Sequence, residues 1–232
     1  MLFFNFINPY IVYITYNLIT ILTIYLIFTK KTWILAHQKT IWLIVTILLV
    51  YSQIARYFLT FLVGRFTIEE GLPFFVCRIS SLFLTFYMFK PKDRFKPLLY
   101  FWGATGILGV FVPNGSISNI ALLTETFFID HYLLAVTPFY LLHINQYKPK
   151  LNDALITTMV FALVLFIFVP LNTLLNADYF YLKDQSVLQY ILPGLSQPMF
   201  IIIHTIGMFL FFMIYYSIAS YYHHTIMKKR LT

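Results

Sequence analysis

The sequence predicts an all-α polytopic membrane protein with about seven transmembrane helices, and two observations support this class. First, 60% of its 232 residues are hydrophobic and only 10% are charged, with a mean hydropathy of +0.81. A soluble domain carries about 25% charged residues, so this chain cannot cover itself with a water-facing surface. Second, apolar runs of about 20 residues, long enough to cross a membrane, recur along the chain. The runs are too long and too uniformly apolar for barrel strands.

The polar residues between the apolar runs delimit the expected helices. We expect one integral membrane domain, 1–232, with spans at about 9–29, 41–63, 72–89, 97–113, 125–145, 154–176 and 197–222. The N-terminus has neither a basic region nor a small-residue cleavage site, so the first span is expected to be an anchor rather than a signal peptide. In the fourth span, Gly103, Gly106 and Gly109 indicate close packing against a neighbouring helix.

Basic residues concentrate in alternate connections between the spans. Those of the first, third and fifth connections and of the C-terminus are Lys30, Lys31, Lys39, Lys90, Lys92, Arg94, Lys96, Lys148, Lys150, Lys228, Lys229 and Arg230. The other connections hold only Arg65 and Lys183. Because basic loops stay in the cytoplasm, we predict an outside N-terminus, a cytoplasmic C-terminus and an odd number of spans. The net charge of +8 then reflects topology and anionic lipids, not nucleic-acid binding.

Cys77, the only cysteine of the chain, stands beside Arg78 near the start of the third span. Cys77, Arg78, Ser81 and Thr85 follow at i, i+1, i+4 and i+8, the spacing of one stripe on a helix. The thiol is the only nucleophile here that can be appreciably ionised near neutral pH, and an adjacent cation favours the thiolate. This stripe is therefore a candidate catalytic surface.

Further polar residues have the same predicted depth as Cys77. Arg56 belongs to the second span, Asp130 and His131 to the fifth, and His204 to the seventh. At 1.5 Å per residue, these groups lie about 8–10 Å below the outer ends of their helices. Polar side chains are costly in lipid and face protein or water. We therefore expect one outward-facing polar cavity at the depth of the lipid acyl esters.

Each candidate also has a purely structural explanation. Cys77 would then be a small apolar side chain, and Arg78 would extend to the outer headgroups. Arg56 would pair with Asp130 and join two helices. The two histidines would each donate a hydrogen bond to a carbonyl in the core.

The helix start Leu72-Pro73-x-x-x-Cys77, followed two spans later by Asp130-His131, resembles the YwaF-like bacterial integral membrane proteins. That family is similar to a eukaryotic transmembrane acyltransferase that remodels ether phosphatidylethanolamine. The resemblance implies that Cys77 and His131 are a catalytic pair. The bacterial relatives often have a histidine two residues before the cysteine, where this chain has Phe75. The base would then be His131 or His204.

The expected mechanism is acyl transfer. His131 takes the thiol proton, and the thiolate of Cys77 attacks a phospholipid ester to form an acyl thioester. Arg78 or Arg56 holds the phosphate or stabilises the oxyanion. Lysolipid or water then accepts the acyl group. Supporting residues are expected to be Asp130, His204 and Ser81.

The alternative class is a transporter or a lipid- or anion-binding membrane protein, with Arg56 and Arg78 in a polar cavity and no covalent chemistry. A metal enzyme is disfavoured because His-Glu-x-x-His and Cys-x-x-Cys spacings are missing. A retinal protein is excluded because the seventh span has no lysine. We therefore expect no metal and no cofactor, and membrane phospholipids as partners. The excess of Phe, Tyr, Ile, Asn and Lys indicates an AT-rich genome and a bacterial cytoplasmic membrane.

Overall fold

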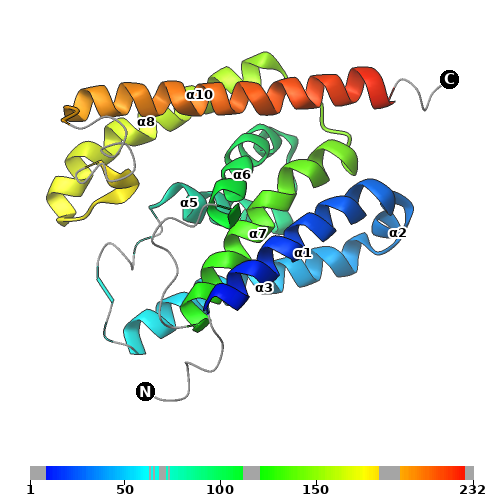
Figure 1. The fold of residues 1–232 in the computed structure, drawn as a ribbon, viewed down its shortest axis with the longest axis horizontal. Coiled ribbons are helices and arrows are strands. Elements are labelled where there is room, and N and C mark those ends of the chain that lie inside the picture. The colour runs from blue at the N-terminus through cyan, green and yellow to red at the C-terminus, as the bar shows by residue number, and fades with distance from the viewer. Residues whose placement is uncertain are drawn as a thin grey trace. The chain divides into compact units, whose positions relative to one another are not determined.

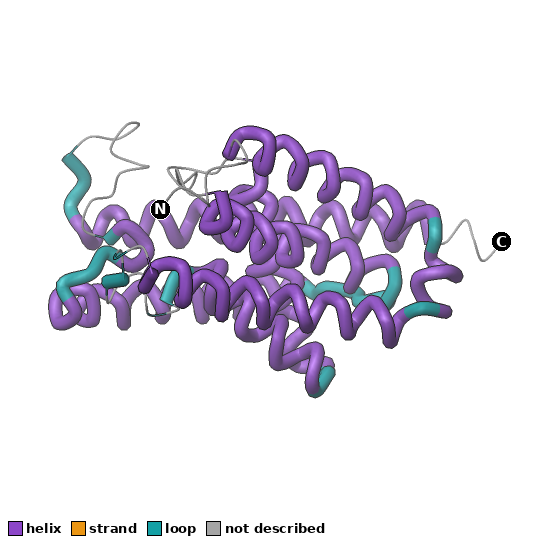
Figure 2. The backbone as a smooth tube through the Cα atoms, turned by 90° about the horizontal axis from the view of Figure 1, so that it is seen from below, coloured by secondary structure: helices purple, strands orange, loops and turns teal. Residues whose placement is uncertain are grey.

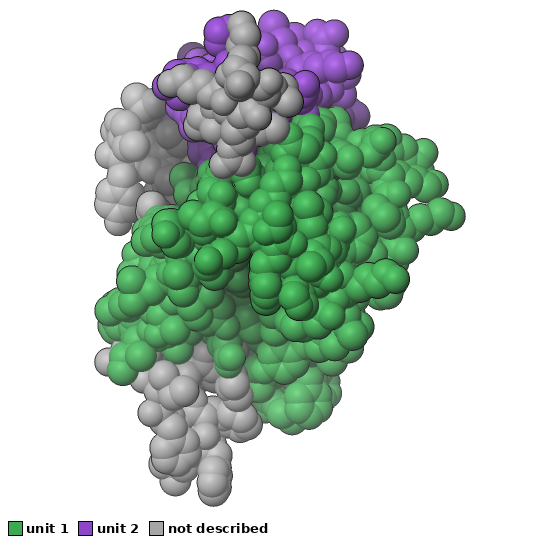
Figure 3. Space-filling view, turned by 90° about the vertical axis from the view of Figure 1, so that its right-hand side faces the viewer, with its two compact units in different colours: residues 1–66, 77–147 green, residues 67–76, 148–232 purple. Residues whose placement is uncertain are grey.

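All regular structure in the described residues is helical, as predicted (Figures 1 and 2). This computed structural model describes residues 9–62, 64, 66–67, 72, 74–111, 121–182 and 194–227. Chain contacts divide the protein into two compact units (Figure 3). Unit 1 comprises residues 1–66 and 77–147, and unit 2 comprises residues 67–76 and 148–232.

Unit 1 is an assembly of helices around α7. Its helices are α1 (Pro9–Thr29), α2 (Lys31–Ala36), α3 (Gln38–Leu62), α5 (Val76–Phe89), the 3₁₀ turn η2 (Asp93–Phe95), α6 (Lys96–Phe111) and α7 (Ala121–His143). Helix α3 is followed by Gly64, whose φ of +67° is left-handed and whose N–H donates to the Phe61 carbonyl at 3.1 Å. Glycine adopts this conformation without the strain that a Cβ would cause, so the chain can turn here.

Helix α7 is the centre of unit 1, and α1, α3 and α6 pack against it. Its Phe128, Leu134 and Ala135 side chains are fully buried. The contact with α6 is close enough that only glycine fits at Gly106, where a Cβ would lie 2.6 Å from the Ala135 backbone nitrogen. The predicted role of the α6 glycines in helix packing is confirmed.

Unit 2 has an aromatic core. It contains α8 (Leu151–Leu175), the 3₁₀ turn η3 (Tyr179–Tyr181), α10 (Gln197–Tyr221) and a terminal π-helical turn, η4 (Tyr222–Met227). The rings that pack there include Phe74, Phe161, Phe168, Tyr179 and Phe180.

The η3 turn is held to α8 by one asparagine. The Asn172 side-chain amide donates to the Tyr179 carbonyl and accepts the Tyr179 N–H, both at 2.9 Å. Asn176, in a left-handed conformation with φ 48°, ends α8 and turns the chain back. An asparagine tolerates this conformation better than most residues, so the turn follows α8 directly.

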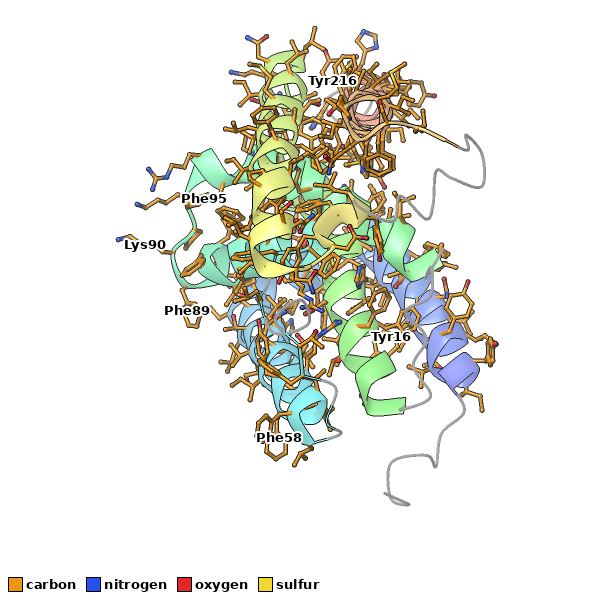
Figure 4. All side chains as sticks on the ribbon, turned by 90° about the vertical axis from the view of Figure 1, so that its left-hand side faces the viewer. Tyr16, Phe58, Phe89, Lys90, Phe95 and Tyr216 are labelled. Atoms are coloured by element: carbon orange, nitrogen blue, oxygen red, sulfur yellow. The ribbon has the colours of Figure 1, made fainter. Side chains whose placement is uncertain are left out.

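Four described helical stretches are long and apolar enough to cross a membrane: Tyr10–Thr29, Gln38–Leu62, Leu151–Leu175 and Gln197–Thr225. Val76–Phe89 is a shorter apolar helix. Large apolar side chains project outward from these helices; Phe58 and Phe89, for example, are 61% and 70% exposed (Figure 4). Because so much apolar surface is unsuited to water, the chain is an integral membrane protein.

Helix α7 is not among these stretches, although it overlaps the predicted span 125–145. It is surrounded by the other helices of unit 1, so its side chains face protein and can include Asp130 and His131. A helix in this position does not need an apolar exterior. Helices also overlap the other six predicted ranges.

Helix α5 begins later than the predicted span 72–89, at Val76. The Phe74 N–H donates to the Leu72 carbonyl at 2.9 Å, which closes a tight turn before the helix. The Phe75 ring packs against Tyr179 within unit 2, with ring centroids 5.4 Å apart. This aromatic packing competes with helix formation, so Cys77 lies in the first turn of α5. The prediction that Cys77 lies about 8 Å below the outer end of its helix is therefore wrong.

Candidate functional site

The centre of the candidate site is the buried carboxylate of Asp130, on α7. The Ser52 hydroxyl lies 2.5 Å from Oδ1, and the Gln53 side-chain amide donates to Oδ2 at 2.8 Å. Both partners come from α3, on which Arg56 also lies. Asp130 is 3% exposed, and a carboxylate buried in this way is stable only with such partners.

Cys77 belongs to the same cluster through its electrostatic neighbours. The thiol interacts electrostatically with Arg78, Arg56 and Asp130, and the Arg78 backbone N–H hydrogen-bonds to its sulfur. Asp130 likewise interacts with both guanidinium groups. Arg78 is 3% exposed, and Cys77 is partly exposed. The cluster therefore consists of four side chains from three helices that interact electrostatically: Cys77, Asp130, Arg56 and Arg78.

His131 is held on the side of α7 that faces α6. Its Nδ1 lies 2.8 Å from the Phe127 carbonyl, and its ring stacks on Phe127 with centroids 3.9 Å apart. Because a carbonyl only accepts, Nδ1 carries the proton, and in the neutral ring the lone pair is on Nε2. His131 interacts electrostatically with Asp130, Arg56 and Arg78.

The position of His131 depends on the absence of a side chain at Gly109. A Cβ at Gly109 would lie 1.8 Å from His131 Cδ2 and 2.5 Å from Nε2, so the imidazole occupies the space that a side chain would fill. The partner of Nδ1 is the Phe127 carbonyl, while Asp130 is held by α3. Adjacent positions on a helix point about 100° apart, which explains why Asp130 and His131 have different partners.

Ser81 lies one helical turn beyond Cys77 on α5. Its side chain is fully buried, and its hydroxyl has no hydrogen-bond partner in the described part of the chain. The Ser81 backbone carbonyl accepts the Thr85 hydroxyl at 2.8 Å. A buried hydroxyl without a partner is costly, which makes this atom noteworthy in the cluster.

The remaining candidate, His204, belongs to unit 2 and has apolar neighbours. Its ring lies between Phe161 and Phe200, with centroid distances of 5.4 Å to each. Phe75, two residues before Cys77, also packs in unit 2, against Tyr179 and Tyr181. Pro73 of the helix-start motif lies outside the described residues.

The cluster includes residues that the sequence alone does not identify as part of a site. The sequence assigns no role to Ser52 and Gln53, and it predicts only a packing role for Gly109. Hydrogen bonds from Ser52 and Gln53 to Asp130 join α3 to α7, the two helices that the suggested Arg56–Asp130 pair would connect. Among the described residues, no three His, Cys, Asp or Glu side chains are arranged to hold a metal ion.

The fold and the site define a class: a helical integral membrane protein in which a thiol, an imidazole, a carboxylate and two guanidinium groups form one cluster. The chain belongs to the TMEM164 family, whose model matches residues 4–216. No curated protein and no solved structure matches the sequence.

Proposed function

We propose that the protein is a membrane-embedded lipid acyltransferase or lipid-ester hydrolase with Cys77 as the nucleophile and His131 as the base. One observation carries this proposal: Cys77, in the first turn of α5, interacts electrostatically with Arg56, Arg78 and Asp130. Nearby cations and the free N–H groups of a first helical turn both stabilise a thiolate. The resemblance to a transmembrane acyltransferase agrees with this chemistry.

The proposed reaction has two steps. His131 Nε2 takes the thiol proton, Sγ forms a bond to the ester carbonyl carbon, and the carbonyl electron pair moves to its oxygen. When the carbonyl re-forms, the ester C–O bond breaks and the leaving alkoxide takes the proton from the imidazolium. In the second step, a lysolipid hydroxyl or water attacks the thioester, and its proton returns through His131 to the departing sulfur.

The histidine and the thiol must meet for this transfer. Among the described residues, no hydrogen bond joins Cys77 to His131. Catalytic hydrogen bonds are often loose in the free enzyme and tighten when the substrate binds. We propose that Sγ and Nε2 come together in the lipid complex, while Arg56 and Arg78 bind the phosphate through their planar guanidinium groups.

The proposal also concerns where the reaction takes place. We propose seven spans with the N-terminus outside and the C-terminus in the cytoplasm, which places the first turn of α5 near the outer leaflet. The substrates are membrane phospholipids. The YwaF-like resemblance and the composition favour the cytoplasmic membrane of a bacterium.

A thioester can be detected directly. Purified wild type and Cys77→Ser are incubated with phosphatidylethanolamine that carries a radiolabelled acyl chain, and the protein is then treated with hydroxylamine, which cleaves thioesters. We expect a hydroxylamine-labile label on the wild type alone. Lipid turnover by the wild type without any labelled protein would overturn the nucleophile assignment.

The second candidate function is transport or binding of an anion. The buried guanidinium of Arg78, with Arg56 acting on the same groups, favours an anionic ligand without requiring covalent chemistry. Solute uptake into proteoliposomes that survives Cys77→Ala would support this function, and uptake that is absent in the wild type would exclude it.

A further inference from the structure

Ser81 presents a fully buried hydroxyl group that has no hydrogen-bond partner among the described residues. Burial without a partner costs free energy, because the hydroxyl loses its hydrogen bonds to water and gains none. Replacement by alanine would avoid this cost.

Several threonine hydroxyls on the helices of this protein are satisfied locally, whereas Ser81 on α5 and Thr205 on α10 have buried hydroxyls without a partner among the described residues. The threonines at 20, 46, 60, 85 and 137 each donate to the carbonyl of the residue four positions earlier, at 2.6–2.9 Å. The corresponding acceptor for Ser81 is the Cys77 carbonyl, one turn back, yet the Ser81 hydroxyl does not use it. The hydroxyl is therefore not satisfied by its own helix.

The geometry of a helix places this hydroxyl next to the proposed nucleophile. Cys77 and Ser81 are four residues apart on α5, so their Cβ atoms lie about 5–6 Å apart on one face. Side chains on a helix lean toward its N-terminus, which brings Ser81 Oγ back over the turn of Cys77.

We infer that Ser81 supplies the oxyanion hydrogen bond for an ester attacked by Cys77; this inference rests on the proposed function. As Sγ bonds to the carbonyl carbon, the π electron pair moves to the carbonyl oxygen, and the Ser81 O–H donates to that oxygen without transferring its proton. When the C–O ester bond breaks, the electron pair returns to the carbonyl and the hydrogen bond weakens. Ser81 is then a catalytic residue, and a hydroxyl held ready in a buried site needs no reorganisation during the reaction.

With this assignment, different residues of the cluster bind different parts of the lipid. With Ser81 on the carbonyl oxygen, Arg56 and Arg78 are available for the charged headgroup of the same lipid. The substrate class is therefore an acyl ester that carries a phosphodiester near the ester group. A neutral acyl glycerol would use the Ser81 contact alone and would bind less tightly.

The test compares four proteins: wild type, Ser81→Ala, Ser81→Thr and Ser80→Ala. Ser80 is as buried as Ser81 but projects about 100° away around the helix, so its variant is a matched control. In detergent micelles with acyl-labelled phosphatidylethanolamine, Ser81→Ala is expected to form the Cys77 thioester about 10²–10³-fold more slowly, with KM nearly unchanged. Ser80→Ala should react like the wild type, and Ser81→Thr should recover most of the rate because it keeps the hydroxyl.

A second measurement separates catalysis from packing. If the hydroxyl serves the reaction, Ser81→Ala unfolds at the same temperature as the wild type or higher, because a buried polar group without a partner has been removed. A lower rate together with a lower unfolding temperature, matched by Ser80→Ala, would overturn the inference in favour of a structural role. An unchanged rate in Ser81→Ala, with a thioester on the wild type, would overturn it and leave the proposed function standing. Failure of the wild type to form a thioester would remove both.

Discussion

His131 in unit 1 and His204 in unit 2 both lie on helices and contact aromatic rings, yet their environments differ. His131 has its Nδ1 proton directed to a carbonyl, a glycine beside its ring, and charged groups acting on it. His204 has two phenylalanine rings and no hydrogen-bond partner among the described residues.

The comparison shows what distinguishes a candidate base from a packed imidazole. A hydrogen bond from one ring nitrogen sets the tautomer, which leaves the other nitrogen as the acceptor. Nothing in the described surroundings of His204 sets its tautomer in this way. The two units differ in the same way. Unit 1 has the buried polar side chains of Ser52, Arg78 and Asp130, whereas the core of unit 2 consists of aromatic rings and the hydrogen-bonded Asn172.

The largest expected effect separates the two histidines. His131→Gln should lower the rate of thioester formation about 10²–10⁴-fold, the usual loss when a general base is removed. The same substitution at His204 should leave the rate within about a factor of three, because His204 packs against phenylalanine rings and takes no part in the proposed proton transfer. The measurement is single-turnover labelling of Cys77. Equal losses in the two variants would show that His204 matters to the reaction as much as His131 does.

The next effect concerns the stability of unit 1. Asp130→Asn keeps the size of the side chain but removes the buried negative charge near two guanidinium groups, and should destabilise the protein by about 3–5 kcal/mol. Asp93→Asn is the matched control, since Asp93 is 92% exposed and its ion pair with Lys96 contributes about 0–1 kcal/mol. Denaturant unfolding in detergent micelles measures both. A small effect of Asp130→Asn would show that the carboxylate does not balance the arginines.

A smaller effect comes from two glycines. Gly109→Ala should displace the His131 ring from the Phe127 carbonyl and slow the reaction about 10–100-fold, because an error of about 1 Å in a catalytic group costs that much. At Gly207 on α10, a Cβ would meet nothing within 4 Å. Gly207→Ala should therefore leave the rate unchanged and add up to about 1 kcal/mol of helix stability.

The two glycine variants are compared by thioester labelling and by thermal unfolding. A Gly109→Ala protein that reacts at the wild-type rate would show that the position of His131 is unimportant. The base would then be another residue.

Several parts of the fold followed from sequence patterns. The helical membrane class came from apolar runs separated by polar residues, and helix α1 occupies the predicted range 9–29. The start of α5 was wrong by four residues, because Phe74 and Phe75 enter the aromatic packing of unit 2 instead of continuing the helix. Such packing joins residues about a hundred positions apart, and the local pattern around Leu72 carries no sign of it.

The sequence by itself determined that this protein lies in a membrane and that it is helical, because both depend on composition and on the length of the apolar runs. It also determined the helix faces on which Cys77, Ser81 and Arg56 lie, because these follow from a period of 3.6 residues. Only the tertiary structure decided which polar groups meet. Asp130 accepts hydrogen bonds from Ser52 and Gln53, and the His131 ring fills the space beside Gly109. Both contacts depend on how each helix is rotated and shifted along its neighbour. Close packing at residues such as Gly106 sets that rotation and shift, and one helix read alone does not contain them.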